Sequence, residues 1–150
     1  MKPVVVSVTI DRPPAEVFAY LEEVEHNPEW LRGMDSCAWV TPPPVRVGSR
    51  YEQVAHFLGK RIETSFEVTE HEPGSLVTIR SLPGSSFPLT VERRVEPAGT
   101  GSLVTETVHS DPSGFYRLAG PLLAWMVRRN IKRDYGALRR LLEAGRVGRG

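Results

Sequence analysis

The segment RYEQVAHFLGKRIETSFEVTE, residues 50–70, decides the fold because it contains two alternating stretches around a short turn. In the second stretch every other side chain is apolar or small, which is the period of a strand with one buried face; these residues are Ile62, Thr64, Phe66 and Val68. The first stretch has the same pattern and places on one face Tyr51, Gln53, Ala55 and Phe57. Gly59 and Lys60 leave room only for a tight hairpin, so we predict antiparallel pairing.

Strand patterns continue on both sides of this hairpin. Residues 4–10 alternate between two faces, and three further strands are predicted after the hairpin, at 75–82, 87–95 and 102–109. Turns rich in Gly and Pro precede or follow them, at 71–74, 83–86 and 97–101. These turns are too short for the crossover helices that parallel pairing requires. We therefore predict an antiparallel sheet whose hairpin strands are 50–58 and 61–70.

Two short helical segments are predicted between the first strand and the hairpin. Pro13 and Pro14 suit the first turn of a helix, after which apolar side chains recur at helical spacing, at Val17, Phe18 and Leu21. Residues 26–31 have the pattern of a second helical turn. The prolines at 42–44 predict an extended connection, because proline cannot continue either element.

A long helix is predicted from about 113 to 144, and unbroken it would reach roughly 45 Å. Pro121 is expected to kink this helix or restart it, since proline removes a hydrogen bond and clashes with the preceding turn. One stripe of the helix is apolar and is expected to grip the sheet, at Leu123, Val127, Ile131, Leu138 and Leu142. Asp134 lies within the stripe, either paired with a partner or at a local break near the sheet edge.

This order of elements resembles the helix-grip superfamily, which includes START lipid-transfer domains and bacterial polyketide cyclase/dehydrase proteins (SRPBCC). The residues that carry the resemblance are Val6-Ser7-Val8-Thr9-Ile10, Pro14, Val17-Phe18, Leu21, Pro28-Glu29-Trp30, Val47-Gly48-Ser49, Gly59 and Val68-Thr69-Glu70-His71-Glu72-Pro73. The likeness covers essentially residues 3–144. It implies an α+β helix-grip fold, in which a curved antiparallel sheet wraps around a long C-terminal helix and two short helices follow the first strand.

The resemblance also implies a cavity between sheet and helix that takes hydrophobic ligands, with enzymes only in some branches and no universal catalytic residue. Residues 1–150 are accordingly expected to form a single domain, with a core at 3–144 and a flexible tail at 145–150. The expected ligand-binding residues are Trp30, Tyr51, Gln53, Phe57, Thr64, Phe66, Arg80, Phe87, Leu89, Leu123, Val127 and Asn130. The alternative for each of them is ordinary packing in the core.

Two arginines lie on the predicted strands among apolar residues. Arg80 shares a face with Leu76 and Thr78, but Val77 and Ile79 make the opposite face equally apolar, so both directions remain open. Arg93 has the inward parity of its strand and is expected at the open end of the cavity.

The sequence is compatible with three functions. We expect a non-catalytic protein that binds a hydrophobic or aromatic small molecule, lipid-like or polyketide-like. The first alternative is a polyketide cyclase/dehydratase-type enzyme in the same cavity, in which Tyr51, Arg80 or a histidine moves protons. His109 beside Asp111 is a candidate pair for that chemistry, and the competing interpretation is a solvated turn.

The second alternative is contact with a membrane surface or a protein partner, including a homodimer. Leu118, Leu122 and Trp125 lie nearly opposite the apolar stripe of a continuous helix. They either line the mouth of the cavity or form an exposed patch beside a basic run, whose cations are Arg128, Arg129, Lys132 and Arg133.

Other classes of function find no support in the sequence. The net charge of +1 gives no field that favours nucleic acid, and no nucleic-acid motif is present. The four histidines and the lone Cys37 lack metal-ligand spacing, and nucleotide-binding motifs are absent, so no metal or cofactor is expected. No apolar run approaches the ~20 residues that span a bilayer, and a cytoplasmic location is the default expectation.

Overall fold

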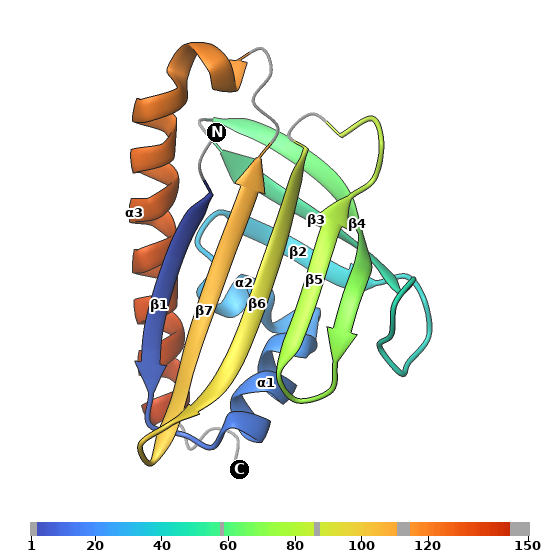
Figure 1. The fold of residues 1–150 in the computed structure, drawn as a ribbon. Helices are drawn as coiled ribbons and strands as arrows, with labels where there is room; N and C mark the ends of the chain where they lie inside the picture. Colours follow the sequence, from blue (N-terminus) through green and yellow to red (C-terminus); the bar gives the residue numbers. More distant parts are fainter. Residues whose placement is uncertain (1–2, 58, 86–87, 111–114, 145–150) are drawn as a thin grey trace.

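The hairpin of residues 50–70 lies within a larger sheet in the computed structural model, which describes residues 3–57, 59–85, 88–110 and 115–144. The strands are β1 (Val4–Ile10), β2 (Met34–Trp39), β3 (Arg50–Phe57), β4 (Lys60–Glu72), β5 (Leu76–Ser81), β6 (Leu89–Ala98) and β7 (Gly101–Ser110). They pair antiparallel in the order β1-β7-β6-β5-β4-β3-β2 (Figure 1). The predicted antiparallel sheet is therefore confirmed.

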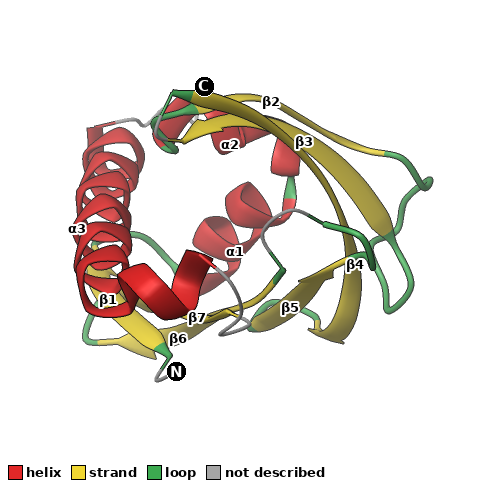
Figure 2. Cartoon of the chain, turned by 90° about the horizontal axis from the view of Figure 1, so that it is seen from above, coloured by secondary structure: helices red, strands yellow, loops and turns green. Residues whose placement is uncertain are grey.

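The helices close the side that the curled sheet leaves open. Short helices follow the first strand, namely α1 (Pro14–Glu22), η1 (Val24–His26) and α2 (Asn27–Trp30). The long helix α3 (Phe115–Ala144) lies between the two edges of the sheet, beside β1 at one edge and near α2 at the other (Figure 2). This arrangement confirms the predicted helix-grip fold.

The strand β2 was not predicted. Its inward side chains include Cys37 and Trp39, which lie opposite Gln53 and Tyr51 of β3. The register shifts between Met34 and Ser36, so the strand does not keep the two-residue period along its length. An irregular strand of six residues gives too weak a pattern to recognise from sequence.

A second register shift changes the end of β4. The strand runs to Glu72, and between Val68 and Glu70 it contains a bulge, so that Thr69 has no Cα partner on β5. The extra residue reverses the parity beyond it and places His71 opposite the inward-facing Val77. Our assignment of His71 to a turn was therefore wrong, since the residue lies in the strand and points into the interior.

The first turns of α3 run at an angle to the rest of the helix (Figures 1 and 2), and Pro121 lies in this part of it. The proline has no N–H for the helical ladder, which is the cause of the bend that the sequence predicted. Beyond the bend, the buried face of α3 contains Asp134, Tyr135, Leu138 and Leu142. Tyr135 was not among the residues that we placed on the gripping stripe.

Gly101 tests how closely the β6–β7 turn packs on the end of β1. A Cβ at this position would meet the backbone carbonyl of Ile10 and lie 2.9 Å from Asp11 Cα. We expect Gly101→Ala to lower the free energy of unfolding by about 1–3 kcal/mol, measured by urea denaturation.

Gly136→Ala is the matched control, because its Cβ would meet only the flexible end of Arg140, at 3.6 Å. In the middle of a helix this change should stabilise by about 0.5–1 kcal/mol. Equal effects of the two substitutions would contradict the close packing at Gly101.

Candidate functional site

Burial of the inward-facing side chains changes along β3 and β4. Tyr51 and Phe66 lie opposite one another and are buried. Two positions further toward the hairpin, Gln53 is half-buried, and the next pair, Ala55 and Ile62, is half-buried on both strands. The interior is thus filled at the level of Tyr51 and looser near the hairpin.

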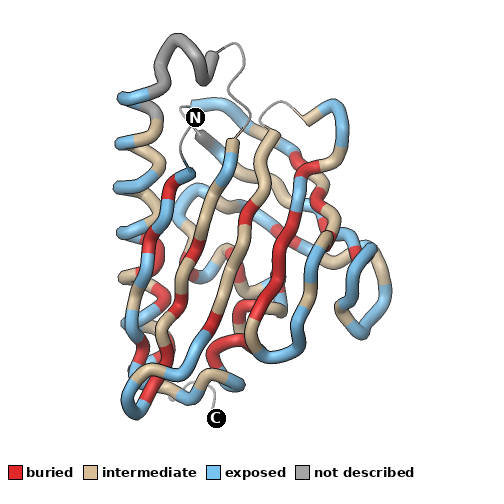
Figure 3. Tube along the Cα trace, viewed as in Figure 1, coloured by how far each residue is buried: buried red, intermediate tan, exposed pale blue. Residues whose placement is uncertain are grey.

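The walls formed by β6, β7 and α3 also differ in burial between the two ends of the interior (Figure 3). Near the hairpin end several inward side chains are half-buried: Leu89, Val108, Val127, Asn130 and Ile131. Toward α1 the inward side chains are fully buried: Val68, Val95, Val104, Leu138 and Leu142. We call these the open end and the closed end of the interior.

A buried ion pair lies between the two ends. Arg93 Nε of β6 is 3.0 Å from Glu106 Oε1 of β7, and the side chains are only 11% and 8% exposed. The hydroxyl of Tyr135 donates to the same oxygen at 2.5 Å. The guanidinium carbon of Arg93 lies 5.3 Å from the centre of the Trp30 ring, which also packs on Tyr135. Arg93 is therefore in the interior, not at the open end where we expected it.

The electrostatics of this cluster favour a permanent cation beside neutral phenols. Burial alone would lower the pKa of Arg93, but Tyr135 and Glu106 raise it above its ordinary value. Burial raises the pKa of Tyr135 and of Tyr51 well above the usual range, so both hydroxyl groups keep their protons. The phenol hydroxyls and the guanidinium can therefore act as hydrogen-bond donors.

A small cavity of about 20 Å³ adjoins Arg93 at the closed end. Its wall is mostly apolar, with Leu21, Val24, Val77, Ile79 and Val91, and it is completed by Glu22, Trp39, Tyr51 and Arg93. This volume holds about one water molecule. The cavity is therefore too small for a drug-sized ligand.

The indole of Trp30 adds an unsatisfied donor to the same region. Trp30 is only 3% exposed, and its Nε1 has no hydrogen-bond partner among the described residues. A buried N–H without an acceptor costs about 1–3 kcal/mol, which a water or a ligand oxygen would recover.

His71 and Glu22 form a second polar pair, between β4 and α1. His71 Nε2 lies 2.6 Å from Glu22 Oε2, and the imidazole is 11% exposed. The ring also lies beside Phe18, with 6.2 Å between ring centres. Sequence reasoning missed this pair because the bulge in β4 reverses the parity of His71, and because Glu22 is 49 residues away in the chain.

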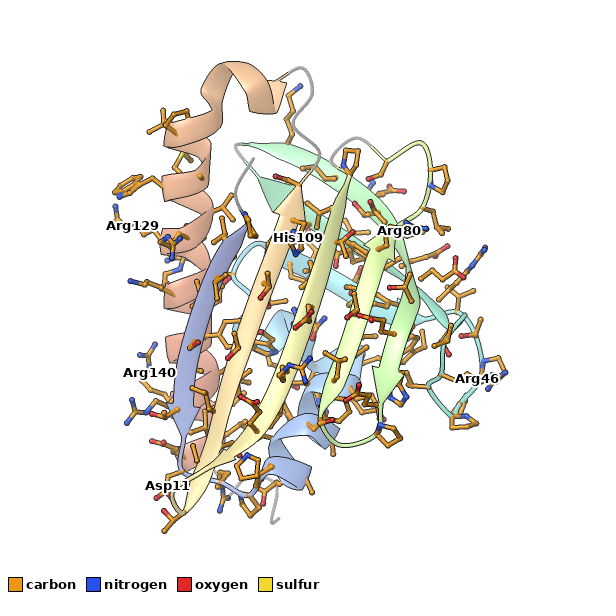
Figure 4. All side chains as sticks on the ribbon, viewed as in Figure 1. Asp11, Arg46, Arg80, His109, Arg129 and Arg140 are labelled. Carbon is orange, nitrogen blue, oxygen red and sulfur yellow. The ribbon has the colours of Figure 1, made fainter. Side chains whose placement is uncertain are left out.

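Two candidates for proton transfer lie outside the interior. Arg80 of β5 is exposed, with Glu67 and Thr90 as its strand neighbours, because Val77 and Ile79 take the inward parity. His109 is also exposed, and Figure 4 shows both residues at the same end of the sheet. The placement of Arg80 in the cavity was therefore wrong, and Asp111 lies outside the described residues.

The remaining predicted site residues divide into two groups. Thr64 and Phe66 are buried on the inward face, and Leu89, Val127 and Asn130 are half-buried there. Phe87 lies outside the described residues, as do the side chains of Phe57, Leu118 and Leu123. Of the patch expected on α3, Leu122 and Trp125 are 62% and 56% exposed, so they face solvent.

Asp134 is buried with partners, which decides between our two interpretations of it. Its Oδ1 accepts a hydrogen bond from the backbone N–H of Arg32 at 3.3 Å and lies 3.5 Å from Arg133 Nη2. Burial raises the pKa of its carboxyl above the ordinary value of 3.8, against the lowering effect of those partners. The side chain joins α3 to the segment after α2.

Metal sites and membrane-spanning helices are two further classes of feature. Among the described residues, no group of three or more His, Cys, Asp or Glu side chains is placed to hold a metal ion. No helix within the same residues is long and apolar enough to cross a membrane.

The pair between Arg93 and Glu106 makes a prediction about stability. Glu106→Ala leaves the Arg93 cation buried without its counter-ion, so we expect the free energy of unfolding to fall by about 3–5 kcal/mol. The double variant Arg93→Met, Glu106→Leu removes both charges and should recover most of that loss, as measured by guanidinium denaturation. A loss below ~1 kcal/mol in the single variant would contradict the buried pair.

Solved structures of other proteins have the same fold. No curated protein matches the chain. Among solved structures, the protein TTHA0849 from Thermus thermophilus is 22% identical with a TM-score of 0.80, covering 95% of this chain and 99% of that one. The protein DR_A0006 from Deinococcus radiodurans is 20% identical with a TM-score of 0.72, covering 97% and 99%. The aromatase/cyclase ZhuI from Streptomyces sp. R1128 is 16% identical with a TM-score of 0.70, covering 96% and 98%.

These likenesses at low identity show the fold. The family model described as polyketide cyclase/dehydrase and lipid transport matches residues 1–143, almost the whole chain. The chain therefore belongs to the polyketide cyclase/dehydrase and lipid transport family.

Proposed function

We propose that the protein binds an apolar small molecule, lipid-like or polyketide-like, in the open end between the sheet and α3. The observation that carries this proposal is the incomplete burial of inward side chains at one end of β3, β4, β6, β7 and α3, from Ala55 and Ile62 to Leu89 and Val127. Inward apolar side chains that stay half-buried leave apolar surface for a ligand to cover, which is favourable at about 25 cal/mol per Å².

The polar groups in and around the interior indicate how such a ligand would be oriented. The Arg93 cation and the unsatisfied indole of Trp30 are donors within a largely apolar interior. A few convergent polar groups in an apolar pocket are the usual means of fixing a ligand's direction. We infer that the ligand carries an acceptor oxygen, such as a carbonyl or carboxylate, at its inner end.

Catalysis in the same space is the second candidate, and the His71–Glu22 pair favours it. An imidazole oriented by a carboxylate is a common arrangement for general acid–base catalysis, and Glu22 lines the small cavity beside Arg93. A dehydrative cyclisation would release one water from the ligand. We rank binding first because the small cavity between this pair and Arg93 admits only a water.

The binding site is tested by filling the open end. We expect Ala55→Trp to weaken binding of palmitic acid and of 1-anilinonaphthalene-8-sulfonate about tenfold or more, because the indole would occupy the space of the ligand. Fluorescence titration and native mass spectrometry measure the affinity, and the mass of the recovered ligand separates binding from loss of water.

Ala38→Trp is the matched control for that experiment. Ala38 is exposed on the neighbouring strand β2 and lies opposite Glu52 on the outer face. The affinity of the Ala38→Trp variant for both ligands should stay within about twofold of wild type, since a surface substitution away from the site has little effect. Equal affinities of the two variants, or no binding by wild type, would contradict the proposed site.

A peripheral membrane contact is a further candidate, favoured by the exposed Trp125 on α3. The guanidinium of Arg129 lies 5.5 Å from the centre of the Trp125 ring, and Arg128 and Lys132 are exposed on the same helix. An aromatic side chain among cations suits the interface of an anionic bilayer.

Vesicle sedimentation tests this contact. We expect binding to vesicles containing phosphatidylglycerol, at low salt, and none to pure phosphatidylcholine. Arg129→Gln should reduce the partition coefficient about fivefold, the effect of ~1 kcal/mol per cation at an anionic surface. Val47 is an apolar residue about as exposed as Trp125 but lies elsewhere on the surface, so Val47→Ala should leave the partition coefficient unchanged. Equal sedimentation with both lipids would remove the membrane candidate.

A further inference from the structure

A large hollow lies outside the sheet-and-helix interior. It has a volume of about 730 Å³, within the usual range for small-molecule sites. One wall is the end of α1 and the start of η1, with Ala19, Glu22, Glu23 and Glu25. The other is the last residue of β2, Trp39, and the loop after it, residues 40–45, with Ser49. We call this hollow the outer groove.

Hydrogen bonds fix the two walls of the outer groove to each other. The backbone N–H of Trp39 donates to Glu25 Oε2 at 3.1 Å, and the indole Nε1 of Trp39 donates to the carbonyl of Glu22 at 3.2 Å. The far end of the loop is held by backbone bonds of Gly48 and Ser49 to Val68, at 2.9 and 2.8 Å. These hydrogen bonds therefore hold the outer groove in its shape.

The residues that line the outer groove combine apolar surface with negative charge. Val40 is 58% exposed, and the three prolines at 42–44 are exposed beside it. The described lining residues include three glutamates and no lysine, arginine or histidine. Arg46 lies at the outer edge of the same loop (Figure 4), where it donates to the carbonyl of Pro44.

The three glutamates differ in the hydrogen bonds and ion pairs that they form. Glu22 directs Oε2 to His71, and Glu25 holds the backbone N–H of Trp39. Glu23 and Glu25 are exposed and form no ion pair with a described side chain. Two negative charges at the rim of an apolar groove thus lack a cationic partner, which favours a positively charged ligand by charge complementarity.

We propose that the outer groove is a second binding site, for a small apolar molecule that bears an ammonium group. The apolar body of the ligand contacts Val40 and the prolines, the ammonium pairs with Glu23 and Glu25, and the half-buried ring of Trp39 offers a cation–π surface. The site is separate from the open end of the interior, so it does not depend on the function proposed above.

The experiment compares three probes of the same shape and different charge. These are 1-naphthylmethylamine, 1-naphthylmethanol and 1-naphthoate, titrated into the ¹⁵N-labelled full chain at about pH 7. We expect the amine to bind about three- to tenfold more tightly than the alcohol, in line with two exposed ion pairs, and the naphthoate to bind least. Amide shifts should be largest at Val40, Thr41 and Val45, since the prolines have no amide proton.

Variants assign the effect to the groove. Glu23→Gln with Glu25→Gln keeps the side-chain oxygen that accepts from Trp39, so the fold should be retained, but the affinity of the amine should fall to that of the alcohol. Glu63→Gln with Glu96→Gln changes two exposed carboxylates on other strands and should leave binding unchanged. Equal affinity for amine and alcohol, no binding of the amine, or shifts centred on interior residues such as Ala55 would overturn the proposal.

Discussion

The ion pair between Arg93 and Glu106 is the constraint around which the interior is arranged. Removing two charges from water costs several kcal/mol per ion, so such a pair persists only when its surroundings satisfy it. Here Tyr135 donates to the shared oxygen of Glu106, and the Trp30 ring lies against the guanidinium. Because these partners come from β6, β7, α3 and α2, the pair sets how the long helix sits relative to the sheet.

The same pair separates two parts of the interior that differ in packing. On one side the apolar side chains of Val95, Val104 and Leu138 are fully buried and supply the core. On the other side several inward side chains stay half-buried, among them Leu89, Val108 and Ile131, although they come from the same strands and the same helix. A well-packed apolar residue would often stabilise such a position as much as a buried ion pair does. The proposed role of Arg93 in orienting a ligand would account for a charge that packing alone does not require.

The sequence predicted the features that depend on a regular local period. The alternation along residues 50–70 gave the antiparallel hairpin, the inward face with Tyr51 and Phe66, and, with the long C-terminal helix, the fold class. Where a bulge breaks the period the prediction failed, and β2 was missed for that reason. The pairing of Arg93 could have been predicted from the sequence. Aligning β6 and β7 as a hairpin places Arg93 opposite Glu106, a carboxylate of the inward face.

Glu22 shows why the rest of the site lies beyond local patterns. Its carboxylate pairs with His71, which reaches the interior only because of the bulge in β4, while its backbone carbonyl holds the indole of Trp39 from an unpredicted strand. Glu22 and Trp39 line both the small cavity and the outer groove, so together they form the wall between them. A helix-terminal glutamate acquires this double role only when two irregular strands fold against it, and neither irregularity is encoded in its own neighbourhood.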